Sequence, residues 1–193
     1  HPRLKDAKDF RILGTPKQRL DLPGKVDGSA VFGLDVRLPE MLVAQVERCP
    51  VFGGKLKSFS ATAASAVEGV RLVVQIPSGI AVIADHYYAA QEGRRALHVE
   101  WDAGPHGELS SASLSTALLE GLGHGTTLIE TGNAKRVIAA SARTFEAVYV
   151  APYLAHAPME PLNCTAHVRN DSCEIWVPTQ SPTGVSETAR AVL

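Results

Sequence analysis

The feature that most constrains the fold is a pair of alternating segments, residues 164–169 and 172–177, separated by Asn170-Asp171. Successive side chains of a β-strand point to opposite faces, and two polar turn residues between such segments are typical of a tight hairpin. The resulting register predicts one wholly apolar, buried face and one polar face. The predicted opposing pairs are Val168 with Cys173, Ala166 with Ile175, Cys164 with Val177, and His167 with Glu174.

Prolines mark the two ends of this hairpin. Pro158 and Pro161 remove backbone donors from the stretch before it, which predicts a fixed, non-helical connection. Pro178 ends the second strand and leaves Thr179-Gln180 on a turn, where rigid scaffolds commonly hold polar groups toward a ligand. A helix is predicted to follow over residues 183–193.

Composition narrows the possible partners. The chain has 193 residues and 45% hydrophobic content, which suffices for one or two domains with a core. Lys and Arg total 19 against 20 for Asp and Glu, so no overall basic surface exists and nucleic acid is not an expected partner. No apolar run approaches the roughly 20 residues of a membrane span. The start, His1-Pro2-Arg3, has no apolar signal region, so we expect any export signal to lie upstream.

The three cysteines are predicted to be free thiols. In the predicted register, Cys164 and Cys173 belong to cross-strand pairs two steps apart, which places their Cα atoms beyond the roughly 7 Å limit for a disulfide. No Cys-x-x-Cys or His-x-x-x-His spacing occurs, so no residue is predicted as a metal ligand.

The block from residue 24 to residue 103 has the pattern of a small α+β unit. Its expected elements are antiparallel strands at Ala30–Val36 and Leu42–Arg48, a helix at Ala61–Val67, a strand with Val70, Leu72, Val74 and Ile76 on one face, a doubly buried strand at Ile80–Ala84, a helix at His86–Ala96 capped by Asp85, and a strand at His98–Trp101.

The remaining segments give the predicted domain organisation. Residues 1–23 are polar and punctuated by proline, which predicts a surface connector. Residues 104–144 are predicted as a helical linker region, with helices at Ser110–Leu119 and Ala134–Ala142. The run from Gly121 to Gly125 trails the first of these helices, so a helix end is favoured over a phosphate-binding loop. Residues 145–193 form the last predicted domain, entered by a strand at Thr144–Val150.

Three motifs resemble one enzyme family. They are Ala-His-Ala-Pro-Met-Glu-Pro at 155–161, Asn-Cys-Thr-Ala-His-Val at 163–168, and Thr-Gln-Ser-Pro at 179–182. Together they resemble the molybdopterin-binding large subunit of molybdenum hydroxylases, the xanthine dehydrogenase and aldehyde oxidase family, and most closely its isoquinoline 1-oxidoreductase branch. The runs at 25–36, 48–54 and 99–102 extend the resemblance upstream.

This resemblance implies a fold and a chemistry. The expected fold is α+β, with an α/β hammerhead domain at 24–103 followed by the N-terminal part of a molybdopterin-binding domain at 145–193. The implied cofactor is molybdopterin with molybdenum, in the cytosine dinucleotide form. The implied reaction hydroxylates N-heterocycles, or oxidises aldehydes, with oxygen derived from water. Electrons would pass to a 2Fe-2S small subunit, with a cytochrome c as a further acceptor, in the bacterial periplasm or at its membrane.

The resemblance also suggests site residues. It implies that Gln180 lies beside the molybdenum centre with Thr179 next to it, because an amide supplies directional donors without adding charge. Glu160 and His156 are further candidates for cofactor binding. From the residues alone, His156 either forms an acid and base pair with Glu160 or, more often, is a histidine satisfied by a backbone hydrogen bond in a rigid loop, with Glu160 an ordinary turn carboxylate. Gln180 is equally compatible with a plain turn residue.

Two functions from different classes remain open at this stage. In the family, the glycine-rich cofactor loop and the base glutamate come after the position of Leu193, so no catalytic set is complete here. The first hypothesis is therefore a fragment of a hydroxylase large subunit, inactive in isolation. The second is a complete, non-catalytic module that binds a partner through the exposed face of the 164–177 hairpin.

Overall fold

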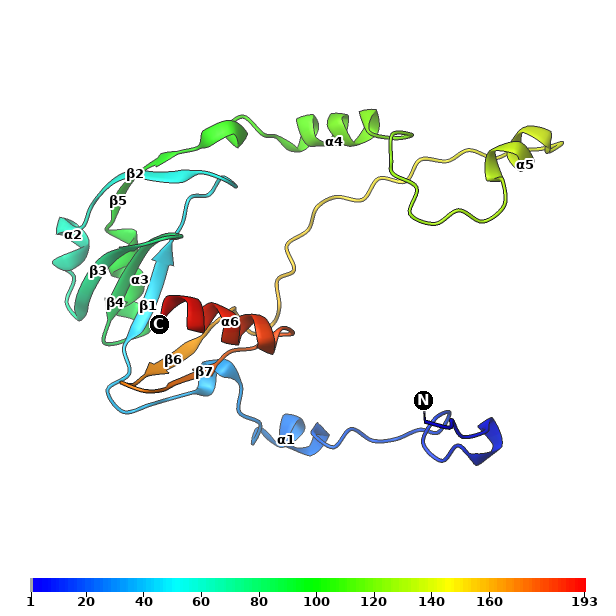
Figure 1. The fold of residues 1–193 in the computed structure, drawn as a ribbon. Coiled ribbons are helices and arrows are strands. Elements are labelled where there is room, and N and C mark those ends of the chain that lie inside the picture. Colours follow the sequence, from blue (N-terminus) through cyan, green and yellow to red (C-terminus); the bar gives the residue numbers. More distant parts are fainter. Residues whose placement is uncertain (1) are drawn as a thin grey trace. The chain divides into compact units, whose positions relative to one another are not determined.

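The computed structural model describes residues 2–193 and has a mixed α+β architecture (Figure 1). The chain forms two compact units, which are described separately. One comprises the residues up to Leu38 together with Tyr153–Leu193, and the other comprises Pro39–Pro152. No helix in the described part of the chain is long and apolar enough to cross a membrane.

The core of the Pro39–Pro152 unit is a three-stranded antiparallel sheet. Its order is β1 (Val43–Glu47), β4 (Gly79–Ala84) and β3 (Val70–Ile76). The central strand β4 is apolar throughout, and Ile80 and Val82 are completely buried. The prediction of a doubly buried strand at Ile80–Ala84 is therefore confirmed.

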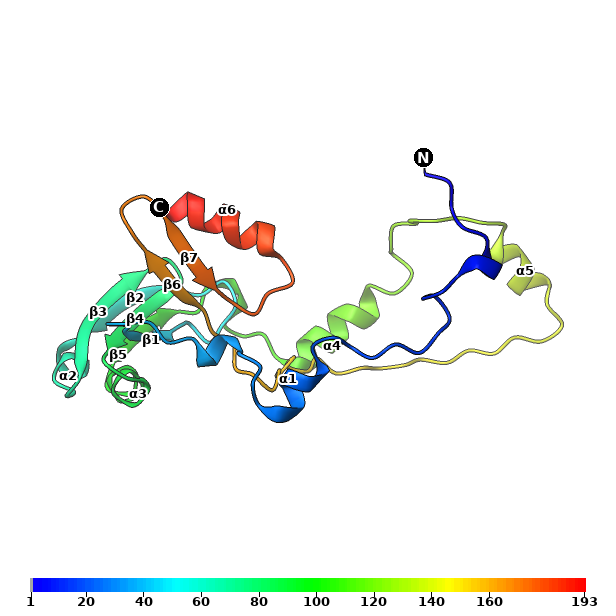
Figure 2. The same cartoon turned by 90° about the horizontal axis from the view of Figure 1, so that it is seen from below.

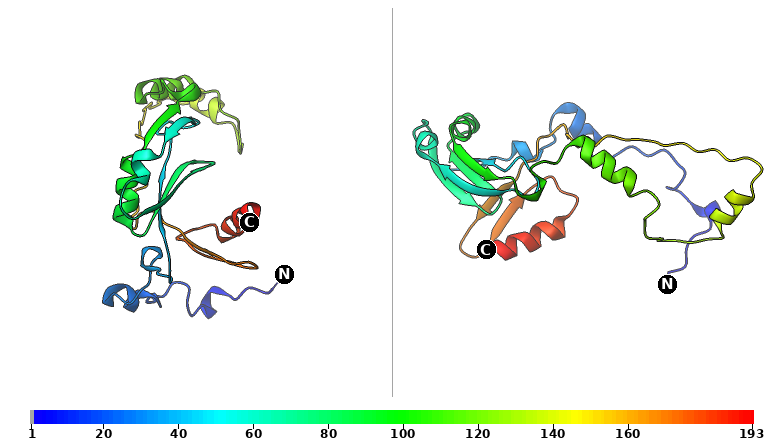
Figure 3. Two further views of the ribbon diagram at one scale, coloured as in Figure 1. Left: turned by 90° about the vertical axis from the view of Figure 1, so that its left-hand side faces the viewer. Right: turned by 90° about the horizontal axis from the view of Figure 1, so that it is seen from above.

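Helix α3 (Tyr87–Arg95) covers one face of this sheet (Figure 3). Its buried residues are Ala89, Ala90 and Gly93, and a methyl group added to Gly93 would lie 2.8 Å from the side chains of both Val70 and Val82. Small residues thus let the helix approach the sheet closely.

The start of α3 differs from the prediction. Nδ1 of His86 accepts a hydrogen bond from the Ala89 amide at 3.2 Å and caps the helix. The predicted cap, Asp85, instead accepts a 2.7 Å hydrogen bond from Nε of Arg71. The prediction of Asp85 as the cap is wrong because a cationic partner on β3 engages its carboxylate.

A β-bulge between Val70 and Leu72 changes the face of β3. Val70 lies on the α3 side of the sheet, whereas Leu72 and Val74 lie on the opposite side and are 52% and 36% exposed. The prediction that Val70 shares a face with Leu72, Val74 and Ile76 is therefore wrong, since one extra residue inverts the alternation.

A second, two-stranded sheet pairs β2 (Lys55–Ser60) with β5 (His98–Asp102), and the short helix α2 (Thr62–Ser65) follows β2. The predicted strand at His98–Trp101 and the predicted helix at Ala61–Val67 are confirmed as β5 and α2, whereas strand β2 was not predicted. The expected strand at Ala30–Val36 is wrong, because a 3-10 helix, η2 (Gly33–Asp35), occupies its centre and belongs to the other unit. Consequently β1 pairs with β4 and not with that segment.

The other unit contains the predicted hairpin. Strands β6 (Thr165–Val168) and β7 (Cys173–Trp176) are antiparallel, and the Arg169 amide bonds the Ser172 carbonyl across the turn. Helix α6 (Pro182–Val192) follows and lies along the hairpin (Figure 2). The observed pairs, which confirm the predicted register, are Val168 with Cys173, Ala166 with Ile175, and His167 with Glu174. The predicted burial of the apolar face is wrong, because Cys164 and Ala166 are exposed and Val168 is 55% exposed.

The region between the second sheet and the hairpin carries two separate helices, α4 (Ser111–Glu120) and α5 (Ala134–Ala140), which confirm predictions. The predicted strand at Thr144–Val150 is wrong, because no pairing strand lies beside this segment in the described chain. The remaining short elements are η1 (Ala7–Asp9), α1 (Leu22–Asp27) and η3 (Gly104–His106).

Candidate functional site

The turn at Thr179-Gln180 lies between the end of β7 and the start of α6. Oγ1 of Thr179 accepts a hydrogen bond from the Ser181 amide at 3.0 Å, which fixes the turn. Gln180 is exposed, and within residues 2–193 its amide has no hydrogen-bond partner. Ser181 makes no capping hydrogen bond to α6, so the first helical amides also keep free donors. The turn therefore presents neutral donors to solvent.

Glu160 is engaged by two donors. Its Oε1 accepts hydrogen bonds from the Leu34 amide at 3.0 Å and from Nδ2 of Asn163 at 2.9 Å. Asn163 also donates to the Pro161 carbonyl at 2.9 Å, so its amide orientation is set by two acceptors. The carboxylate thus joins the connection before β6 to the segment around η2.

Close packing surrounds this carboxylate. A methyl group added to Gly33 would collide with Oδ1 of Asn163 and would lie 3.1 Å from Cδ of Pro178. Oδ1 of Asn163 is buried and has no hydrogen-bond partner in the described chain. Sequence reasoning missed the role of Gly33, Leu34 and Asn163. The sequence signals for these residues were the family-like motifs at 25–36 and 163–168.

His156 does not form the acid and base pair considered from the sequence. It is exposed, while the hydrogen bonds of Glu160 go to Leu34 and Asn163. The next residue, Ala157, has a φ of 40°, which is costly for a residue with a Cβ and is a kind of strain that clusters at functional segments.

An apolar groove of about 580 Å³ separates the apolar face of the hairpin from α6. Its walls include Ala166 and Ile175 from the hairpin and Val185 and Ala189 from the helix. Cys164 and Cys173 also line it as free thiols, and burial, with a smaller contribution from Cys173, raises the pKa of the Cys164 thiol.

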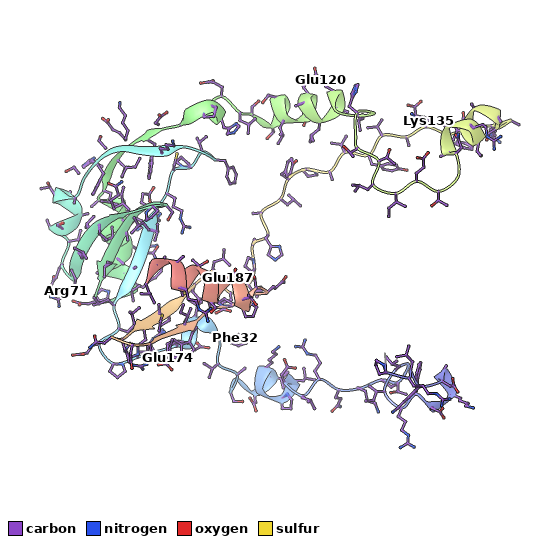
Figure 4. The ribbon with its side chains drawn as sticks, in the orientation of Figure 1. Phe32, Arg71, Glu120, Lys135, Glu174 and Glu187 are labelled. Atoms are coloured by element: carbon purple, nitrogen blue, oxygen red, sulfur yellow. The ribbon has the colours of Figure 1, made fainter. Side chains whose placement is uncertain are left out.

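The outer face of the hairpin is polar and paired within itself. Nη2 of Arg169 lies 2.6 Å from Oε2 of Glu174 and 3.0 Å from Nδ1 of His167. Glu174 is seen on the side of β7 away from α6 (Figure 4). The sequence predicted the pairing of His167 with Glu174 but not the bridging Arg169, although residues 167 and 169 share a face by alternation.

The donor set fits hydrogen bonding to a cofactor rather than coordination of a metal. Among residues 2–193, no group of three or more His, Cys, Asp or Glu side chains could hold a metal ion. The free amide of Gln180 and the Thr179 hydroxyl are neutral and can satisfy oxygen atoms of a bound group without competing as ligands.

The sequence of this chain is similar to a protein family and to several known proteins. The molybdopterin cofactor-binding domain family matches residues 120–193. Isoquinoline 1-oxidoreductase subunit beta of Brevundimonas diminuta is 30% identical over 93% of this chain and 24% of its own length. The membrane-bound aldehyde dehydrogenase (pyrroloquinoline-quinone) of Gluconacetobacter polyoxogenes is 26% identical over 92% of this chain and 24% of its own length.

A solved structure shares the fold. The crystal structure of quinoline 2-oxidoreductase from Pseudomonas putida 86 matches 92% of this chain and 28% of that chain, with a TM-score of 0.65 and 18% identity. The chain thus spans about a quarter of the length of these relatives.

Proposed function

Because the chain belongs to the molybdopterin-binding large subunits of the molybdenum hydroxylase family, we propose that it supplies scaffold and one wall of a cofactor site in an oxidoreductase. In this proposal residues 24–103 are the hammerhead domain, and residues 145–193 begin the cofactor-binding domain. The full-length protein would hydroxylate an N-heterocycle of the isoquinoline type, or oxidise an aldehyde, with oxygen derived from water.

The observation that carries the proposal is the free amide of Gln180 on a turn fixed by Thr179. The molybdenum cofactor, when bound, supplies two-electron redox chemistry and activates water. Gln180 and Thr179 would hold it by hydrogen bonds, with His156 as a further contact. A neutral amide adds no charge to the site, so it orients the group while leaving its charge balance unchanged.

The proposal includes a partner and a location. The three cysteines of this chain do not make up a four-cysteine iron-sulfur cluster by themselves. The proposed route takes electrons out through a 2Fe-2S small subunit, with a cytochrome c as a further acceptor. The relative named as membrane-bound supports a periplasmic or membrane-associated enzyme. The competing hypothesis, a partner-binding module that uses the outer hairpin face, is less favoured because Arg169, Glu174 and His167 already satisfy one another there.

The first test measures molybdenum in the full-length gene product. We expect about one molybdenum per chain, together with turnover of either isoquinoline-type heterocycles or aldehydes. Gln180→Ala should keep the metal and lower kcat by on the order of 10², the typical cost of removing one positioned donor. The matched control is Gln18→Ala, at an exposed position in the N-terminal connector, which should leave kcat unchanged.

Two results would count against the proposal. A full-length protein without molybdenum would remove the cofactor assignment. Normal kcat in Gln180→Ala would remove this residue from the site even if the metal is present.

A further inference from the structure

We infer that Glu160 is a positioning residue that acts as a hydrogen-bond acceptor and does not need its negative charge. It links the Leu34 backbone to the connection before β6 and so holds the Thr179-Gln180 turn in place. The catalytic consequence of this link rests on the proposed function of Gln180. The hydrogen bond between Leu34 and Glu160, which we call the tether, and its effect on Gln180 are measured by separate readouts.

The tether joins segments that are distant in sequence. The Leu34 amide and Glu160 are 126 residues apart, and their hydrogen bond is 3.0 Å long. Nδ2 of Asn163 reaches the same carboxylate oxygen at 2.9 Å. A single oxygen, Oε1, therefore receives both donors.

The tethered segment is held in one conformation. Oδ2 of Asp35 accepts a 2.9 Å hydrogen bond from the Phe32 amide, which closes the turn of η2 (Figure 4 labels Phe32). The absence of a side chain at Gly33 lets this turn sit against Asn163 and Pro178. Leu34 is thus presented to Glu160 by a rigid backbone.

The contact with Pro178 links the tether to the candidate site. Pro178 is two residues before Gln180, and Thr179 fixes the turn between them by accepting from Ser181. A shift of η2 relative to the connection before β6 would change the packing against Pro178. The amide of Gln180 would then lose its defined position, and a misplacement of about 1 Å can cost a site on the order of 10²-fold in rate.

The contacts of Glu160 are those of a hydrogen-bond acceptor and do not require its negative charge. Within residues 2–193 Glu160 forms no salt bridge, and both of its hydrogen bonds use one oxygen. A glutamine has the same length and keeps one carbonyl oxygen, so it can receive both donors. An aspartate is one methylene shorter and cannot keep both contacts. An acid, a base or an anionic ligand would fail in the glutamine variant.

The experiment compares Glu160→Gln, Glu160→Asp and Glu160→Ala in the full-length protein. Amide hydrogen exchange at Leu34 reports the tether, and kcat together with molybdenum content reports the site. We expect Glu160→Gln to keep Leu34 protection and kcat within about twofold of wild type. Glu160→Ala should lower Leu34 protection by roughly tenfold, because the Leu34 amide loses its acceptor, with a parallel loss of kcat. Glu160→Asp should fall between them.

Controls and a second variant keep the inference testable. Glu187, an exposed carboxylate on α6, is the matched control, and its Ala and Gln variants should change neither readout. Gly33→Ala leaves Glu160 in place but crowds Asn163 and Pro178, so it should also lower kcat; this decides the positioning role if Glu160→Ala does not fold.

Three outcomes would overturn the inference. Equal losses of kcat in Glu160→Gln and Glu160→Ala would show that the charge is required. Unchanged Leu34 protection in Glu160→Ala would show that no tether exists, and unchanged kcat there would show that the tether does not position the site. If the full-length protein lacks molybdenum, the proposed function fails while the exchange measurement still decides the tether.

Discussion

At the scale of single residues, two neighbouring side chains that can both cap a helix take different roles. Asp85 and His86 can both accept from a helix N-terminal amide, and sequence preference favours Asp. In the structure Arg71 engages Asp85 and lowers the pKa of its carboxyl group, mainly through their hydrogen bond, while His86 caps α3. Only the position of Arg71 on the neighbouring strand decides between these assignments.

The lowered pKa of Asp85 predicts a pH dependence of stability. A carboxyl group whose folded-state pKa is depressed stabilises the fold above its unfolded pKa of about 3.9, and this contribution is lost as the pH falls through the folded value. We expect Asp85→Asn to have a lower Tm than wild type at pH 7, and the difference to shrink as the pH falls below that unfolded pKa. Melting curves measured across this range test it. A difference that stays constant with pH would contradict the ion-pair explanation.

At the scale of elements, sequence patterns predicted a strand correctly where its pairing partner lies nearby in the chain. The hairpin register follows from alternation around a two-residue turn, so the pairing of Ala166 with Ile175 could be predicted from the sequence. Strand β2 was missed because its partner β5 lies about 40 residues downstream and because four of its own six residues, Lys-Leu-Lys-Ser-Phe-Ser, are polar. The expected strand at Ala30–Val36 contains Gly33, which lies in the 3-10 helix η2 and packs closely against Asn163, a residue about 130 positions downstream.

The packing of α3 gives a prediction at this scale. Gly93→Ala places a methyl group 2.8 Å from both Val70 and Val82, which is too close for two core side chains. Overpacking costs about 1–3 kcal/mol, whereas the gain in helix propensity is about 1 kcal/mol, so we expect net destabilisation. Chemical denaturation measures the change. The control is Gly125→Ala, where nothing lies within 4 Å, and equal stability of the two variants would contradict the predicted clash.

At the scale of the whole molecule, the chain leaves large apolar side chains uncovered. Phe145, Tyr149 and Leu154 are 86%, 93% and 83% exposed. The chain also spans about a quarter of its relatives' length. Both observations support the proposal that further parts of a longer subunit cover these residues.

This exposure predicts the behaviour of the 193 residues expressed alone. We expect them to bind hydrophobic dye, to self-associate in sedimentation, and to show neither molybdenum nor turnover. Serine at positions 145, 149 and 154 should reduce dye binding and association, because it removes the largest exposed apolar surfaces. Stoichiometric molybdenum with turnover in the isolated chain would contradict this view.

The sequence by itself determined the α+β class, the hairpin register, most helices and the family, because these depend on short-range periodicity and contiguous motifs. The tertiary structure decided which residues share a face of β3, what caps α3, and where the carboxylate of Glu160 points. Those features depend on a bulge, an ion pair and a hydrogen bond between residues that are far apart in the chain. Their energies arise only once the backbone has brought the partners together, so no local pattern encodes them.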